Sequence, residues 1–61
     1  MSAVAKAHET ARRLARLGWS ALDIESAIIR DLRHASGMSR GQYVAKAQQI
    51  AAAAVRGRDR R

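Results

Sequence analysis

The sequence of 61 residues contains no cysteine, no proline and no phenylalanine. The lack of cysteine excludes disulfides and thiolate zinc sites. The two histidines, His8 and His34, are too few to build a structural metal site without several carboxylates beside them. We therefore expect no metal and no other cofactor. The lack of proline fits helices that run without interruption.

Acidic residues are scarce as well. The chain has five of them and twelve Lys and Arg residues, which gives a net charge of +7 and a pI near 11.6. Such a charge favours an anionic partner, of which nucleic acid is the commonest. Ten of the twelve basic residues are arginine, whose planar fork binds phosphate and base edges in a bidentate manner. Two alternatives stay open: the charge keeps an alanine-rich protein soluble, or a GC-rich genome favours Arg and Ala codons.

Long apolar runs are absent, because the longest one, residues 50–55, is too short to cross a bilayer, and no N-terminal stretch has the pattern of a signal peptide. We expect a soluble, cytoplasmic protein with no membrane partner. A chain of this length buries a small core, and self-association is a usual remedy where disulfides and metals are excluded. We therefore expect a homodimer.

The spacing of apolar residues predicts an all-α fold of three helices at about residues 2–17, 20–36 and 39–56. They form a single domain, 1–57, with a basic tail at 58–61, arranged in a helix-turn-helix-like manner or as a small bundle. Ser2, Ser20 and Ser39 are the expected N-caps, and Ser39 with Gln42 matches the S-x-x-Q capping box. Gly18 is the expected left-handed C-cap, with Trp19 packing back onto the helix, and a second break falls near Gly37. Gly57 is expected to end the third helix.

Each helix has an apolar side. In the first helix it comprises Val4, Ala7, Ala11, Leu14 and Leu17, opposite Glu9, Arg12, Arg13 and Arg16. In the second it comprises Ala21, Leu22, Ile24, Ile28, Ile29, Leu32 and Ala35, an arc wide enough to face two neighbours or a second subunit. Within this arc Glu25 needs an Arg, Tyr43 or backbone partner, unless it reaches solvent or marks a dimer seam. In the third it comprises Tyr43, Val44, Ala47, Ile50, Ala51 and Ala54.

Enzyme motifs are missing: there is no cysteine nucleophile, no glycine-rich phosphate loop and no H-E-x-x-H. Three short helices also leave little room for a concave substrate site. We therefore expect no catalytic residues, no small-molecule substrate and no enzymatic activity.

The segment from Ala11 to Ile28 reads A-R-R-L-A-R-L-G-W-S-A-L-D-I-E-S-A-I, a helix, a G-x-S turn and a second helix. It resembles the helix-turn-helix DNA-binding domains of bacterial and phage regulators. A second G-x-S turn, at residues 37–39, makes the third helix similar to a recognition helix. The second helix departs from that family, since it is about four turns long where about two are usual.

The resemblance implies that the third helix reads the major groove of DNA, with base or phosphate contacts from Arg40, Gln42, Lys46 and Gln49. Two basic clusters could hold phosphates, one of Arg12, Arg13 and Arg16 and one of Arg58, Arg60 and Arg61. The alternative for the first cluster is a solvated face on which Glu9 pairs with Arg13.

The leading functional hypothesis is a homodimeric DNA-binding regulator of the bacterial or phage kind. The main rival is a helical module that docks on a host or partner protein through the apolar face of the second helix. Its interface residues would be Trp19, Leu22, Ile24, Glu25 and Ile28. Association of the first helix with a membrane surface is less favoured, because that helix offers no aromatic residue to the lipid.

Overall fold

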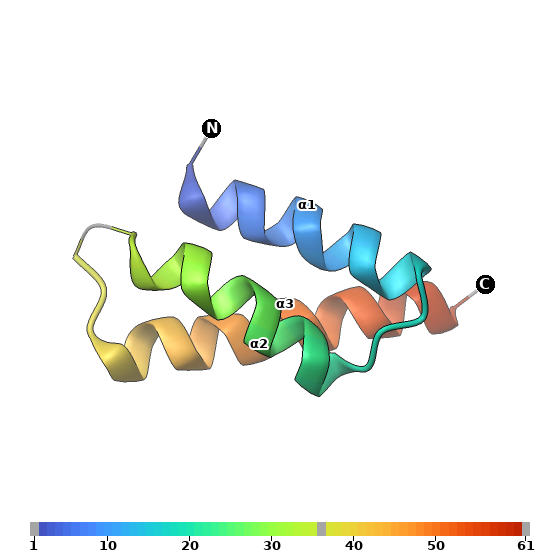
Figure 1. Cartoon of the computed structure of the whole chain (residues 1–61). Helices are drawn as coiled ribbons and strands as arrows, with labels where there is room; N and C mark the ends of the chain where they lie inside the picture. Colours follow the sequence, from blue (N-terminus) through green and yellow to red (C-terminus); the bar gives the residue numbers. More distant parts are fainter. Residues whose placement is uncertain (1, 36, 61) are drawn as a thin grey trace.

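The structure, a computed structural model, describes residues 2–35 and 37–60. These contain three helices, α1 (Ala3–Arg16), α2 (Ala21–Arg33) and α3 (Arg40–Asp59). The chain reverses its direction between successive helices, so that α2 is antiparallel to α1 and to α3 (Figure 1). Each helix packs on both others. The predicted all-α domain of three helices is therefore confirmed, in the form of a small bundle with extents of 35 × 22 × 15 Å.

Serine side chains fix the start of every helix, as the sequence predicts. The Oγ atoms of Ser2, Ser20 and Ser39 accept hydrogen bonds from the backbone N–H groups three residues later, at 3.1, 3.2 and 3.3 Å. In addition, the Ser39 N–H donates to Oε1 of Gln42 at 2.9 Å, which completes the predicted capping box. Each bond satisfies a backbone donor that has no partner within its helix.

The turn between α1 and α2 is a Schellman motif. Gly18 has a φ of 94°, a conformation that glycine adopts without the steric cost of a Cβ atom. The Gly18 N–H donates to the Ala15 carbonyl at 3.0 Å, and the Trp19 N–H donates to the Leu14 carbonyl at 3.1 Å. The predicted left-handed cap at Gly18 is thus confirmed. Gly37 also has a positive φ, of 83°, in the connection between α2 and α3.

The predicted end of the third helix is wrong. α3 continues through Gly57 to Asp59, and the N–H of its C-cap Arg60 donates to the Arg56 carbonyl at 3.1 Å. A glycine inside a helix costs only about 0.5–1 kcal/mol relative to alanine, which neighbouring contacts can offset. Residues 58–60 are therefore part of the bundle and not a separate tail, while Arg61 lies outside the described residues. The second helix is also shorter than predicted, since α2 ends at Arg33. Ser36, where the sequence predicts its end, lies outside the described residues as well.

The core is small and rich in alanine. α1 contributes Ala7, Ala11 and Ala15, which recur every four residues along one side of the helix. The larger buried side chains come from α2 and α3, and the full set is Ala7, Ala11, Ala15, Ile24, Ile28, Leu32, Ala47, Ile50 and Ala51. α1 and α3 thus contribute mainly small side chains to the core, whereas α2 contributes large ones.

Burial corrects two of the predictions made for α1 and α2. Ile24 and Ile28 are completely buried in the core of one chain, so they cannot belong to an exposed docking face. Leu17, which the sequence places on the apolar side of the first helix, is the C-cap of α1 and is 70% exposed. α2 packs on both α1 and α3, and these two neighbours together cover most residues of its wide apolar arc.

Candidate nucleic-acid interface

A groove runs between α1 and α3 along the side of the bundle. It consists of three adjoining hollows that share lining residues. We call it the α1–α3 groove and define it by His8, Arg12 and Arg16 of α1 together with Lys46, Gln49, Ile50, Ala53, Ala54, Arg56, Gly57 and Arg58 of α3. Because its floor is mostly alanine and glycine, the longer polar side chains form its two walls.

Helical spacing explains how the walls arise. On α1, His8, Arg12 and Arg16 recur every four residues, each next in sequence to one of the buried alanines. On α3, Lys46, Gln49, Ala53 and Arg56 follow three- and four-residue steps and therefore share one side of the helix. Two rows of polar side chains consequently flank a seam of small residues.

The groove is strongly positive. Of the described residues that line it, five are cationic, namely Arg12, Arg16, Lys46, Arg56 and Arg58, and none is a carboxylate. Three of the five acidic residues, Asp23, Glu25 and Asp31, belong to α2. The helices thus divide the charge, with cations along α1 and α3 and most carboxylates on α2.

Most of these cations have no carboxylate partner among the residues that the structure describes. Among residues 2–35 and 37–60, the one ion pair joins Nε of Arg58 to Oδ1 of Asp59 at 3.0 Å. The possible pair of Glu9 with Arg13 is not formed within that part of the chain. Arg12, Arg16 and Arg56 are exposed and Lys46 is half-buried, so their charges are available to an anion from solution.

Arg58 differs from the other groove cations because its Nε and Nη1 atoms donate hydrogen bonds within the chain. Its Nη1 donates to the carbonyl oxygens of Ala15 at 3.2 Å and of Trp19 at 2.9 Å, and the side chain is 30% exposed. The guanidinium therefore ties the C-terminal end of α3 to the end of α1, where a cation also complements the helix dipole. The sequence assigned Arg58 to a phosphate-binding tail, whereas here it joins two helices of the bundle.

The remaining residues of the predicted site are dispersed. Arg40 and Gln42 lie at the start of α3 and do not line the groove, and the Gln42 carbonyl oxygen is engaged in the capping box. Arg13 and Arg60 are exposed outside the groove lining. The structure thus places Arg12, Arg16, Lys46, Gln49 and Arg58 along one groove, with Lys46 and Gln49 in a different hollow of it from Arg16 and Arg58.

Two groove residues, His8 and Arg56, are absent from the predicted site. Their signal in the sequence is the four-residue step from His8 to Arg12 and the seven-residue step from Gln49 to Arg56. That signal has meaning only once α1 and α3 are known to be neighbours, because neither helix alone shows which of its polar sides borders the other.

The predicted protein interface is reduced to its exposed members. Trp19 is 41% and Leu22 71% exposed, next to the turn between α1 and α2. Glu25 is half-buried and lies beside Leu22, Gln48 and Ala51. Within residues 2–35 and 37–60 no hydrogen-bond partner is found for its carboxylate, whose fractional exposure fits the solvent-reaching alternative.

In the described part of the chain, no helix combines the length and the apolar character needed to cross a membrane, and no three His, Asp or Glu side chains gather where they could hold a metal ion. No protein-family model, no curated protein and no solved structure is a significant match to this chain, and a functional proposal therefore depends on its own side chains.

Proposed function

We propose that the protein binds nucleic acid, duplex DNA in the first instance, by placing the α1–α3 groove on the phosphate backbone. The observation that carries this proposal is the gathering of cations from two helices along one groove, whose described lining residues include no carboxylate. Arginine forks bind phosphate oxygens in a bidentate manner, and three of the unpaired groove cations are arginine.

The geometry favours backbone contacts over the reading of bases by α3. Of the four residues that the helix-turn-helix resemblance assigns to bases or phosphates, Arg40 and Gln42 lie away from the groove. Lys46 and Gln49 remain within it, in the hollow that they share with His8 of α1 and with Arg56. Phosphate contacts position a protein on DNA but carry no sequence information directly. We therefore propose binding with little sequence preference.

The proposal gives a salt dependence that can be measured. Arg12, Arg16, Lys46 and Arg56 are the four cations of the groove whose side-chain donors are not used within the described chain. If each neutralises one phosphate, the logarithm of the affinity falls with a slope of about −3.6 against the logarithm of salt concentration. This slope corresponds to a loss of roughly 100-fold between 50 and 200 mM salt.

The test is a fluorescence-anisotropy titration of a labelled, mixed-sequence duplex at several salt concentrations. The groove variant carries Arg12→Gln and Arg56→Gln, and the matched control carries Arg30→Gln and Arg33→Gln on α2, with the same change in net charge. We expect the groove variant to bind more weakly and its salt slope to fall in magnitude by about 2. The control variant should retain most of its affinity and of its salt slope.

Two results would contradict the proposal. One is the absence of binding at low salt by the unchanged protein. The other is an equal loss of affinity in both variants, which would show that overall charge matters and that the groove does not. Circular dichroism of each variant checks that the helices remain folded.

A further inference from the structure

The α1–α3 groove contains a histidine, the kind of side chain whose charge changes near neutral pH. His8 lies in the second turn of α1, is half-buried, and directly follows the core residue Ala7. A histidine gains or loses its charge between about pH 5 and 8, whereas Arg and Lys keep theirs throughout that range. The position of this ring therefore decides whether the positive charge of the groove varies with pH.

His8 lies where two of the three hollows of the groove meet. It lines one hollow together with Lys46, Gln49 and Arg56 of α3, and another together with Arg12 of α1. Among the described residues it is the one side chain that α1 contributes to the first of these hollows. With a neutral ring this hollow has cations on its α3 side alone, and with a protonated ring it has them on both sides.

The ring of His8 is available to a bound anion. Within residues 2–35 and 37–60, neither of its nitrogen atoms takes part in a hydrogen bond or an ion pair. The charged groups that share its hollows are Arg12 from its own helix and Lys46 and Arg56 from α3, and no described residue of α2 lines either hollow. Glu9, the next residue in the sequence, is exposed and is not among the lining residues. A phosphate would thus bring negative charge to a hollow whose described charges are all positive.

We propose that His8 couples nucleic-acid binding to pH, so that the groove holds the phosphate backbone more tightly when the ring is protonated. This inference rests on the proposed function, because it requires a phosphate in the groove. A phosphate beside the ring favours its protonated form, since opposite charges attract. Binding of nucleic acid and binding of the proton therefore strengthen each other, and formation of the complex takes up a proton.

The size of the effect follows from one additional phosphate contact. The groove has four cations with unused donors, and protonation of His8 adds a fifth. Each contact contributes about −0.9 to the salt slope, so the slope should steepen from about −3.6 at pH 8.0 to about −4.5 at pH 5.5. At 50 mM salt, one such contact corresponds to a gain in affinity of roughly tenfold.

The test is a fluorescence-anisotropy titration of the labelled, mixed-sequence duplex at pH 5.5 and at pH 8.0, with the same salt concentration. We expect the unchanged protein to bind about tenfold more tightly at pH 5.5. His8→Gln cannot gain a proton, so its affinity should be nearly the same at both pH values and should match that of the unchanged protein at pH 8.0. His8→Arg is charged at both pH values and should bind at pH 8.0 about as tightly as the unchanged protein does at pH 5.5.

The second histidine of the chain provides a matched control. His34 is the C-cap of α2, is exposed, and is not among the residues that line the three hollows. His34→Gln removes the same kind of titrating group from another place and should retain the full dependence on pH. The amino terminus also titrates in this range, but it is present in every variant and cannot cause a difference between them. Circular dichroism at both pH values checks that the helices remain folded.

The outcomes separate this inference from the proposed function. Equal affinity of the unchanged protein at the two pH values overturns the coupling, and so does a dependence on pH that persists in His8→Gln or disappears in His34→Gln. Nucleic-acid binding itself stands in these cases, because the titrations at pH 8.0 measure it directly. Absence of binding by the unchanged protein at low salt and at both pH values overturns the proposed function and the coupling together.

Discussion

Removing the guanidinium of Arg58 should destabilise the whole bundle, although the residue lies close to the end of a chain of 61. Its Nη1 holds two carbonyl oxygens, of Ala15 and Trp19, at 3.2 and 2.9 Å. A hydrogen bond to a charged group contributes about 1.5–3 kcal/mol. Because the side chain is 30% exposed, solvent reduces what each bond contributes, and we expect Arg58→Met to lower the free energy of unfolding by about 2 kcal/mol for the two bonds together, less than the sum of two such contributions.

This loss would be large for so small a protein, since a single core of this size supplies about 3–5 kcal/mol. For domains of 60–100 residues, 1 kcal/mol corresponds to about 4–8 °C in Tm, so the expected drop is roughly 8–16 °C. Methionine keeps an unbranched apolar stem, which separates the loss of hydrogen bonds from the loss of packing. The Tm of Arg58→Lys should lie between that of Arg58→Met and that of the unchanged protein, because an ammonium keeps the charge but lacks the planar fork.

The measurement is thermal unfolding followed by circular dichroism, with Arg60→Met as the matched control. Arg60 lies two residues further on, is exposed and donates no side-chain hydrogen bond within the described residues. If both variants melt within a degree or two of each other, the link between α3 and the end of α1 contributes nothing, and the reasoning is refuted.

Two further changes test the packing of the helices. Gly57→Ala should raise the free energy of unfolding by about 0.5–1 kcal/mol in a urea titration, because the position is helical and an added Cβ meets no atom within 4 Å; a loss of stability would show that α3 needs the glycine there. Ala11→Leu should lower it by about 1–3 kcal/mol, since Ala11 is completely buried where α1 packs on the bundle, whereas Ala5→Leu, at an exposed position of α1, should change it little.

Local signals in the sequence are sufficient for the helices and most of their ends. The serine caps, the capping box and the positive φ of Gly18 depend on residues within a few positions of one another. Such contacts form in the same way whatever the rest of the chain does. The end of α3 differs from its prediction because a distant contact, between Arg58 and the end of α1, adds to the stability of the helix beyond Gly57.

Tertiary information is needed for the sites. The apolar periodicity of α2 shows that Leu22, Ile24 and Ile28 share a broad side, but not that two of them are buried by α1 and α3 while Leu22 is exposed. In the same way, the sequence identifies Arg12 and Arg16 as a basic cluster, yet the cations opposite them on α3 are set by how the two helices pack. Charge patterns therefore indicate the kind of partner better than the residues that would contact it.

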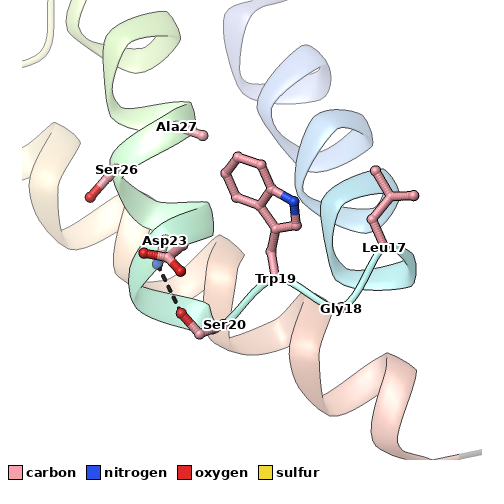
Figure 2. A pocket seen from close by; sticks show the side chains of 7 residues that line it. All are labelled: Leu17, Gly18, Trp19, Ser20, Asp23, Ser26 and Ala27. Carbon is pink, nitrogen blue, oxygen red and sulfur yellow. Dashed lines mark hydrogen bonds between the residues drawn. The ribbon is translucent and has the colours of Figure 1, made fainter.

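The position of Trp19 makes the protein its own optical probe. It is the single tryptophan of the chain, and its indole stands between the ends of α1 and α2 (Figure 2), away from the lining of the α1–α3 groove. Its emission should shift to longer wavelength when the bundle unfolds, because the indole is only 41% exposed in the folded chain. Unfolding can therefore be followed in dilute solution without a label, and separately from events in the groove.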